Sequence, residues 1–357
     1  MRVANRFVVS LFILHVIVMG ILISRLHFFS GSRNLQDFDS YIQLVGSIRA
    51  GQNPYSTNST ATLGAPSTFL LYLPFSFLKL PSAQLTFLII NIAAGYLICL
   101  LLSKKWILLS ATILFSAFVT RFSLLMGQPA LLGALLVTVF LLFENQTLSV
   151  LSVVGLGILK TFFFPLGIFF LSKPKVFIQF IFFSLLITVL TFAFMKISWY
   201  EYFVRNTFIP LFSTNSCASN LDYYNQSLRS TLCRLHIAFP YLSSLVSLLF
   251  IAVAFLKKGK KLWVLAIFLF SPVLWQHYFV MLFPIYVLIF FELRKNVFSL
   301  RTAACVLSFI LWYIQFPYLQ IAPHTFWNGV LASHYYWAAL LLFFVTARMK
   351  PRRRRDQ

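Results

Sequence analysis

Long apolar runs recur from one end of the chain to the other, and they constrain its fold more than any other feature. A helix that crosses the hydrocarbon core of a bilayer needs about 20 predominantly apolar residues. Runs near this length cover residues 7–24, 83–102, 106–122, 126–143, 176–195, 237–256, 262–278, 279–293, 302–317 and 331–347. The chain is 60% hydrophobic and 10% charged, whereas soluble domains are about 45–50% apolar and about 25% charged. A soluble domain is excluded, and an all-α, polytopic integral membrane protein is expected.

Two further apolar segments differ from ordinary spans. Residues 67–79 are too short to cross a bilayer, and residues 147–171 are interrupted by Lys160 and Pro165. We expect half-helices or re-entrant segments here, because irregular backbone at membrane depth is tolerated only where it is buried in protein or lines a cavity. With such segments included, we expect about 11 to 13 membrane helices.

The basic residues predict the orientation of the chain. It has 29 Lys and Arg against 7 Asp and Glu, for a formal charge of +22, and cytoplasmic loops of membrane proteins are enriched in Lys and Arg. If the N-terminus is cytoplasmic and 147–171 returns to the side from which it enters, all the basic clusters are cytoplasmic. These clusters are Lys104 and Lys105, Lys173 and Lys175, Lys257 to Lys261, Arg294 to Arg301, and Arg348 to Arg355. The positive charge is thus explained by topology, and no nucleic-acid partner is expected.

This orientation predicts a single membrane domain over residues 1–357, with both termini in the cytoplasm. Its external loops cover residues 25–66 and 196–236, and residues 348–357 form a basic cytoplasmic tail. The first run resembles a signal peptide, but no small-x-small cleavage site follows it, so we expect a retained first helix.

Sequence signals for a bound metal, nucleotide or redox group are lacking. The four cysteines, Cys99, Cys217, Cys233 and Cys305, show no CxxC spacing, and no His/acid cluster has metal-ligand spacing. There is no Gly-rich phosphate loop. We therefore expect neither a cofactor nor a metal. Cys217 and Cys233 lie in the second external loop and could form a disulfide in an oxidising compartment.

Acidic residues are so scarce that candidate bases can be found by elimination. In the predicted topology Glu144, Glu292 and Asp356 are cytoplasmic, beside basic clusters. The acids on the outer side are Asp37, Asp39, Glu201 and Asp222. An enzyme that transfers a group to a hydroxyl there needs a carboxylate or histidine as base.

Asp37 and Asp39 open a segment with helical periodicity. Its apolar residues Phe38, Tyr41, Val45 and Ile48 recur at the spacing of one helix face, which predicts a short amphipathic helix at the membrane surface. Gly51 fits the C′ position that ends such a helix, and Pro54 follows as a stop.

The two acids of this helix allow more than one interpretation. Asp37 is either an N-cap, which would accept backbone N–H groups at the helix start, or a catalytic base, and the two roles are compatible. Asp39 is expected to be a first-turn partner of the helix dipole or an ion-pair partner of Arg33 or Arg49.

Two other positions could contact a substrate. Lys160 stands alone in an apolar segment, where a cation is costly unless paired, so it either pairs with a lipid phosphate or extends to the interface. Gly127 and Gln128 end an apolar helix on the outer side, where the amide could bond a hydroxyl, or they mark only the start of the next helix.

The second external loop and the segment near 271–278 carry further candidates. Arg229 and Arg234 could clamp a phosphate by bidentate contacts, or anchor an interfacial helix. After Pro272, Trp275 and His277 lie near the outer end of a helix. Such a histidine is either a hydrogen-bonding core group or a substrate ligand.

Several of these stretches occur in an order found in one protein family. They are DF…Y…GxNPY (37–55), YLPFSFLKLP (72–81), Gly127-Gln128, the lysine of ILKTFFFPL (158–166), NQSLRSTLCRL (225–235) and SPVLWQHY (271–278). Together they resemble glycosyltransferase family 87, whose members are GT-C membrane enzymes similar to polyprenyl-phosphate-mannose-dependent mannosyltransferases. Each motif is short, and family members commonly carry Asn after the GQ pair, where this chain has Pro129.

The resemblance implies a GT-C-type helical bundle and roles for particular residues. Asp37 takes the place of the general base at the start of the first external loop, and His277 that of the histidine in the active-site cavity. Substrate contacts fall on Asp39, Tyr41, Asn53, Tyr55, Gln128, Lys160, Asn225, Ser227, Arg229 and Trp275.

The resemblance also implies a reaction. A hexose, expected to be mannose, passes from a polyprenyl-phosphate sugar to a hydroxyl of a lipid-linked or glycan acceptor, at the periplasmic or exterior face of the plasma (inner) membrane. A single displacement would invert the anomeric carbon, and no metal would be required. Two other classes remain open: a lipid or glycolipid transporter (flippase), which also has broken helices and buried charges, and a glycan polymerase or ligase. The expected partners are the lipid-linked donor, the acceptor and membrane lipids.

Overall fold

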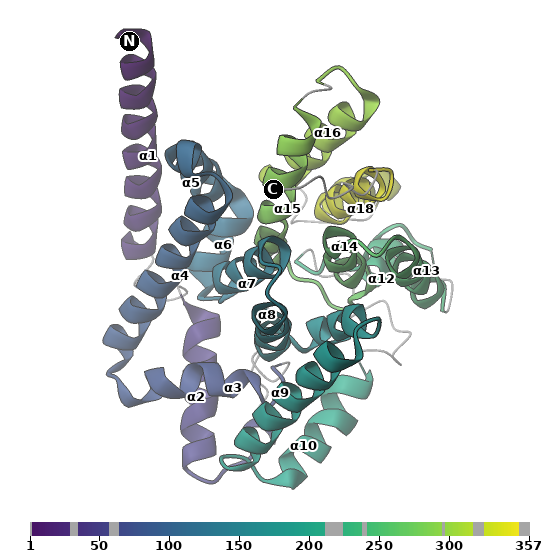
Figure 1. Ribbon diagram of the computed structural model, residues 1–357. Coiled ribbons are helices and arrows are strands. Elements are labelled where there is room, and N and C mark those ends of the chain that lie inside the picture. The colour runs from purple at the N-terminus through teal and green to yellow at the C-terminus, as the bar shows by residue number, and fades with distance from the viewer. Residues whose placement is uncertain are drawn as a thin grey trace. The chain divides into compact units, whose positions relative to one another are not determined.

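The structure, a computed structural model, describes residues 2–28, 35–56, 64–210, 224–237, 241–294, 297–316 and 325–349. Within these ranges the regular structure is helical, apart from one isolated antiparallel bridge between Asn225 and Trp275 (Figure 1). The prediction of an all-α protein is thus confirmed. The GT-C-type arrangement of its helices stays a prediction.

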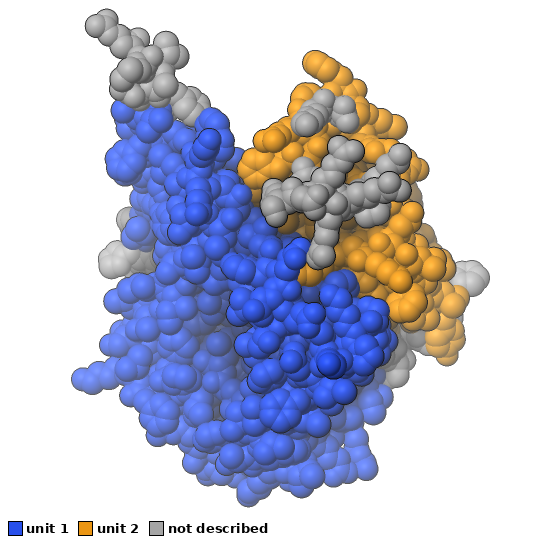
Figure 2. Space-filling model, viewed as in Figure 1, with its two compact units in different colours: residues 1–214, 277–284 blue, residues 215–276, 285–357 orange. Residues whose placement is uncertain are grey.

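The chain forms two compact units, which are described separately (Figure 2). Unit 1 comprises residues 1–214 together with 277–284, and unit 2 comprises residues 215–276 and 285–357. Unit 1 therefore includes a short segment that interrupts the sequence of unit 2. The predicted single membrane domain over 1–357 stays a prediction.

Unit 1 contains the predicted first external loop and most of the candidate site. Its helices are α1 (Arg2–Phe28), α2 (Gln36–Arg49), η1 (Pro54–Ser56), α3 (Thr68–Tyr72), η3 (Leu73–Phe77), α4 (Leu80–Leu102), η4 (Lys104–Trp106), α5 (Ile107–Ser116), α6 (Phe118–Met126), α7 (Ala130–Leu142), α8 (Gln146–Leu159), η5 (Thr161–Phe170), α9 (Pro174–Phe192), α10 (Ile197–Phe203) and η6 (Val204–Phe208). Its later segment, 277–284, contains most of η8 (Gln276–Leu282).

Unit 2 is built from helices of the C-terminal part. They are α12 (Leu228–Arg234), α13 (Leu242–Lys257), α14 (Lys260–Phe270), α15 (Phe283–Leu293), whose first residues belong to unit 1, α16 (Leu300–Tyr313), α17 (Phe326–Ala332) and α18 (His334–Ala347). Here α18 packs against both α14 and α16. Lys261 of α14 and Glu292 of α15 form an ion pair at 2.7 Å.

Among the residues that the structure describes, four helical segments are long and apolar enough to cross a membrane: Val8–Arg25, Leu80–Leu102, Pro174–Phe192 and Gln276–Leu293. The number rises to six if each of two bent helix pairs is one span. Shorter apolar helices include Ala130–Leu142, Gln146–Leu159 and Leu300–Tyr313. These helices support a helical protein that crosses a membrane several times. Their orientation and the identity of the membrane stay predictions.

The predicted run 262–278 divides between α14, which ends at Phe270, and η8, which begins at Gln276. Two other predicted runs are bent helix pairs in the structure. The run 106–122 divides at Ala117 into α5 and α6, with a bend of 66°, and the run 331–347 covers the end of α17 and then α18, with a bend of 64°. The backbone of Ala117 is extended, with φ −61° and ψ 135°, which interrupts the helix. Apolarity continues through both breaks, so hydropathy did not mark them.

The segments 67–79 and 147–171 are mostly helical in the structure, and the predicted interruption at Pro165 is wrong, because Pro165 lies inside the 3-10 helix η5. Residues 68–77 form two short helical pieces, α3 and η3, and the segment 147–171 breaks at Lys160, which is extended. The two halves of the second segment, α8 and η5, pack against each other. The predicted interruption at Lys160 is confirmed.

The predicted amphipathic helix is present as α2. Phe38, Tyr41, Val45 and Ile48 are buried, as the periodicity required. Gly51 adopts φ 73° at the predicted C′ position, where its N–H donates to the carbonyl of Ile48 at 3.0 Å. The buried face packs against α3 and η3, which fixes the acids at the start of α2 within unit 1.

The first helix is joined to its neighbours by a polar network. Nδ1 of His15 lies 3.1 Å from Oγ1 of Thr112 on α5, and Nε2 lies 2.7 Å from the hydroxyl of Tyr96 on α4. Thr112 donates its own proton to the carbonyl of Leu108, so it accepts from Nδ1–H. His15 thus connects α1 with α4 and α5. Retention of the first helix stays a prediction.

Candidate active site

Asp37 lies in the first turn of α2 and is held by a side chain from the turn between α6 and α7. The helix begins at Gln36, and its N-cap is Leu35, with φ 56° and no side-chain cap. The N-cap interpretation of Asp37 is therefore wrong: the N–H of Leu35 donates to the carbonyl of Leu125 at 2.7 Å, and the helix starts before Asp37. The Asp37 carboxylate instead accepts a 2.6 Å hydrogen bond from Nε2 of Gln128.

The end of α6 delivers Gln128 to this position. Gly127 ends α6 with φ 73°, its N–H donates to Leu124 at 3.2 Å, and the N–H of Gln128 donates to Ser123 at 2.9 Å, which is a Schellman arrangement. A Cβ on Gly127 would lie 2.7 Å from Cβ of Phe38. Glycine is thus required both for the backbone conformation and for the close approach of α6 to α2.

Lys160 lies among tyrosine side chains beside Asp37. Its Nζ is 3.5 Å from the hydroxyl of Tyr41 and 4.7 Å from the ring centre of Tyr278. Cations are stabilised over the faces of aromatic rings. The charge of Lys160 also acts on Asp37, one of the causes that lower the pKa of that carboxyl. The alternative that Lys160 extends to an interface is not needed to explain a cation in these surroundings.

Several polar side chains of unit 1 are buried with unsatisfied atoms, and three of them lie near Asp37 and Lys160. His277 is 4% exposed, and within the described part of the chain neither of its ring nitrogens has a hydrogen-bond partner. The same holds there for the hydroxyl of Tyr72, which stacks on Tyr41 at 4.4 Å, and for Oε1 of Gln128. Each such atom costs about 1–3 kcal/mol, so their occurrence beside Asp37 and Lys160 favours a ligand site.

Aromatic contacts place His277 in the same neighbourhood. Its ring lies edge-on to Tyr278, with the ring centres 4.2 Å apart, and 6.1 Å from the ring of Phe122 on α6. Tyr278 in turn covers Lys160. The structure therefore brings together Asp37, Gln128, Lys160 and His277, which are far apart in the sequence.

The environment of Asp37 sets its protonation. Burial raises the pKa of the carboxyl above the ordinary value of 3.8, and this exceeds the opposing effects of the Gln128 hydrogen bond and the Lys160 charge. A carboxylate with a raised pKa is a stronger base than an exposed one. The position thus has the properties of a general base.

Asp39 lies in the first turn of α2, as expected of a partner of the helix dipole, but it does not form the expected ion pair with Arg49. Its carboxylate accepts a 2.8 Å hydrogen bond from Nε2 of Gln84. The predicted ion pair with Arg49 is wrong, because Arg49 donates to the carbonyl of Ser76 at 3.0 Å and lies over the ring of Phe77. The other predicted partner, Arg33, lies outside the described residues.

Asn53 and Tyr55 make contacts within the predicted first external loop. Oδ1 of Asn53 accepts the N–H of Tyr55 at 3.0 Å, and the hydroxyl of Tyr55 donates to the carbonyl of Gly64 at 3.1 Å. The Tyr55 ring is buried against Phe69 and Phe203. These contacts shape the loop, and the implied role in substrate binding stays a prediction.

In unit 2 the structure brings Asn225, Ser227 and Trp275 together. Oδ1 of Asn225 accepts the N–H groups of Ser227 at 3.2 Å and Leu274 at 3.1 Å, and Asn225 bridges to Trp275. Ser227 is the N-cap of α12 and accepts the N–H of Ser230. The NQS motif thus holds two segments of unit 2 side by side, and its implied substrate contacts stay predictions.

The two arginines of α12 differ in their surroundings. Arg234 is completely buried and donates to the carbonyl of Asn225 at 2.7 Å and to Oγ of Ser333 at 3.0 Å. The interpretation of Arg234 as a phosphate clamp is therefore wrong, because its guanidinium is used inside unit 2. Arg229 is half-buried.

The remaining candidates of the predicted second external loop have different surroundings, and two of them lie outside the described residues. Glu201 forms an exposed ion pair with Arg205 at 2.8 Å, an arrangement typical of a surface charge. Cys233 is disulfide-bonded, while Cys99 and Cys305 are free. Its predicted partner, Cys217, and the acid Asp222 lie outside the described residues.

Sequence reasoning assigned no role to Tyr72 or Tyr278. Tyr72 stacks on Tyr41, and Tyr278 covers Lys160. Both belong to motifs that carry the family resemblance, and Tyr278 directly follows His277. Both tyrosines could have been identified as aromatic residues within motifs, because a cation in an apolar segment needs aromatic or acidic partners.

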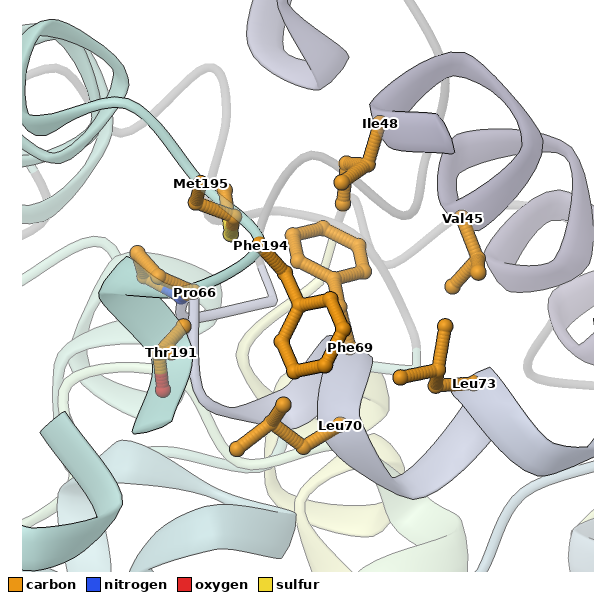
Figure 3. A pocket seen from close by; sticks show the side chains of 9 residues that line it. All are labelled: Val45, Ile48, Pro66, Phe69, Leu70, Leu73, Thr191, Phe194 and Met195. Carbon is orange, nitrogen blue, oxygen red and sulfur yellow. The ribbon is translucent and has the colours of Figure 1, made fainter. Parts of the chain in front are cut away.

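A separate small apolar pocket lies farther along α2 (Figure 3). Its lining includes Val45 and Ile48 of α2, Phe69 of α3, and Met195 just after α9. The ring of Phe69 also packs edge-on against Tyr41. None of the predicted site residues lines this pocket.

Comparisons with known proteins do not extend these observations. No protein-family model, curated protein or solved structure gives a significant match to the chain. Among the described residues no three His, Cys, Asp or Glu side chains are grouped so that they could hold a metal ion.

Proposed function

We propose that this chain is an inverting membrane glycosyltransferase that moves a hexose from a polyprenyl-phosphate sugar to an acceptor hydroxyl. The observation that carries the proposal is the hydrogen bond between Asp37 and Gln128 beside the Lys160 cation. It places a candidate base and a candidate phosphate partner in one cluster. Mannose as the hexose follows from the family resemblance.

The reaction would proceed by a single displacement. The acceptor oxygen attacks the anomeric carbon while Asp37 takes the hydroxyl proton. The bond between the anomeric carbon and the phosphate oxygen breaks, and its electron pair leaves with the polyprenyl phosphate. Attack opposite the leaving group inverts the anomeric carbon. This leaving group carries one phosphate, so the proposed reaction requires no metal.

Lys160 would bind the phosphate of the donor. A cation near the leaving oxygen stabilises the negative charge that develops there, and in surroundings of low dielectric the effect is stronger than in water. The tyrosine rings of Tyr41 and Tyr278 hold the lysine without neutralising its charge. His277, whose ring nitrogens have no partner among the described residues, would add a contact to the donor or to the transferred sugar.

The same cluster argues against the two other classes. A transporter needs buried charges but no base with a raised pKa, whereas burial raises the pKa of Asp37. A polymerase or ligase that uses lipid pyrophosphates would employ arginines of a large external loop, and Arg234 is buried within unit 2. We therefore favour the glycosyltransferase and place its active side at the outer face of a plasma (inner) membrane.

The donor is tested with the purified chain in lipid nanodiscs. Labelled polyprenyl-phosphate sugars are supplied one at a time with a glycolipid acceptor extract, and we expect transfer from one of them, with mannose first. Lys160→Met should lower kcat/KM for that donor about 10- to 100-fold, because a charge-assisted contact of about 1.5–3 kcal/mol is lost. Lys160→Arg, which keeps the charge, should retain more activity. Absence of transfer and hydrolysis with every donor would favour a transporter.

The pH dependence follows from the raised pKa of Asp37. Only the ionised carboxylate accepts a proton, so transfer should fall as the pH is lowered through that pKa. Because burial raises the pKa above 3.8, the loss should begin at a higher pH than for an exposed aspartate. The measurement is kcat/KM between pH 4 and 8 at saturating donor, with the thermal unfolding midpoint recorded in parallel. A rate that stays constant down to pH 4 would exclude Asp37 as the base.

A further inference from the structure

The orientation of the Gln128 side-chain amide indicates what kind of acceptor the site can bind. Nε2 of Gln128 lies 2.6 Å from Oδ2 of Asp37. A carboxylate only accepts hydrogen bonds, so the NH₂ group of Gln128 must face it, and the carbonyl Oε1 must point elsewhere. The assignment of the two amide atoms is therefore fixed by chemistry.

The other atom of this amide is left unsatisfied. Within the part of the chain that the structure describes, Oε1 of Gln128 is buried and has no hydrogen-bond donor, and the side chain is 4% exposed. The backbone around it is fixed by the Schellman turn at Gly127. A rigidly held acceptor without a donor beside a candidate base is the arrangement expected of a substrate contact.

Asp37 has room for a second hydrogen bond. Its carboxylate is only partly buried, and the bond from Gln128 occupies Oδ2. Oδ1 of Asp37 and Oε1 of Gln128 are thus two further acceptors of this hydrogen-bonded pair. A ligand that satisfies both must carry two hydrogen-bond donors close to each other.

We propose, building on the glycosyltransferase function, that the acceptor is a vicinal diol of a sugar or polyol and that Gln128 selects it. One hydroxyl donates to Asp37 and attacks the donor. The hydroxyl on the neighbouring carbon donates to Oε1 of Gln128. A lone alcohol, such as a serine side chain or a polyprenol, would leave Oε1 unsatisfied and is a poor acceptor.

The proposal predicts which acceptor hydroxyls matter. Transfer is measured to an octyl mannoside and to each of its monodeoxy derivatives, below the micelle concentration, with the wild-type chain in nanodiscs. Loss of the attacked hydroxyl gives no product, and loss of one adjacent hydroxyl should lower kcat/KM about 10- to 100-fold. If no adjacent hydroxyl matters, the proposal is wrong.

A matched pair of variants connects this effect with Gln128. Gln128→Met keeps the approximate volume of the side chain but removes both amide contacts, so the overall rate should fall. In this variant, removal of the hydroxyl next to the attacked one should lower kcat/KM by less than about threefold. Gln84→Met removes an amide from the other acid of α2, Asp39. In that variant the full loss in kcat/KM should persist. An unchanged loss in Gln128→Met would assign the selectivity to other residues.

Equilibrium binding separates this proposal from the glycosyltransferase function. The same glycosides are titrated onto wild-type chain without donor, and the adjacent deoxy position should weaken Kd about tenfold. If this pattern is found but no donor supports transfer, the diol site stands and the enzymatic function fails. If transfer occurs and neither binding nor rate depends on the adjacent hydroxyl, the function stands and the diol site fails.

Discussion

Replacing Asp37 with Asn is expected to lower sugar transfer by about 10²- to 10⁴-fold, the usual effect of removing a general base. The replacement is isosteric, and the carbonyl oxygen of Asn can still accept the hydrogen bond of Gln128, so the geometry of the site should be retained. What is lost is the group that takes the proton of the acceptor hydroxyl. The measurement is kcat in nanodiscs with the preferred donor, with the unfolding midpoint as a check on folding.

The neighbouring acid provides the control for this prediction. Asp39→Asn removes the same charge from the same helix, and Gln84 can still donate to it. We expect Asp39→Asn to retain at least about a tenth of the activity, since it removes no base. Equal losses in the two variants would mean that the charge of α2, rather than the base at Asp37, is what transfer requires. Full activity of Asp37→Asn would remove Asp37 from the mechanism.

The largest loss of stability is expected from Gly127→Ala. Gly127 has φ 73°, which costs a residue with a side chain about 1–2 kcal/mol. The added Cβ would also lie 2.7 Å from Cβ of Phe38 and 3.1 Å from Cα of Leu35, so α2 or α6 must move. Overpacking of this kind costs about 1–3 kcal/mol more. We expect a loss of about 2–5 kcal/mol, and a loss of transfer because Gln128 is displaced from Asp37.

A comparison with Gly51→Ala separates the cost of backbone strain from the cost of overpacking. Gly51 has the same φ of 73° at the other end of α2, and nothing lies within 4 Å of an added Cβ. Gly51→Ala should therefore cost only the backbone strain of about 1–2 kcal/mol and leave transfer intact. The free energy of unfolding is measured by denaturant titration in mixed micelles. If both variants lose equal stability, the close approach of α6 to α2 is not what requires Gly127.

Periodicity and hydropathy were sufficient for much of the fold. The spacing of Phe38, Tyr41, Val45 and Ile48 predicted α2 and its buried face, because a short helix packed on one side must repeat its apolar residues at the helical period. Gly51 predicted the end of the helix, since the left-handed backbone conformation that commonly ends a helix favours glycine. Such local rules depend on residues close in sequence.

Features that depend on distant contacts were not accessible in this way. Asp37 looked like an N-cap, but Leu35 is tied to Leu125 on another helix, so α2 begins earlier than its sequence indicates. Arg234 looked like a phosphate clamp, but its hydroxyl partner Ser333 lies in a different segment of unit 2. The partners in both cases follow from tertiary packing, for which a single sequence holds no direct signal.

The residues of the candidate site were identified from their chemistry and from the order of motifs, and not from periodicity. Scarcity of acids and the cost of a lone lysine singled out Asp37 and Lys160, while the order of short motifs added Gln128 and His277. Their assembly in unit 1 was not predictable from these arguments. It depends on the turn at Gly127 and on the interruption at Lys160, each of which brings a polar side chain to the start of α2 or to the tyrosines near it.

The interleaved sequence of the two units has a consequence for how the protein is made. Unit 1 is completed only by residues 277–284, so a ribosome delivers Asp37, Gln128 and Lys160 well before Tyr278. At ordinary rates of synthesis the interval is on the order of ten seconds. During that time the charged side chain of Lys160 lacks its contact with the ring of Tyr278. This is also the stage at which nascent segments partition into lipid. No single cut in the polypeptide can separate the two units, and unit 1 is complete only after the late segment has been synthesised.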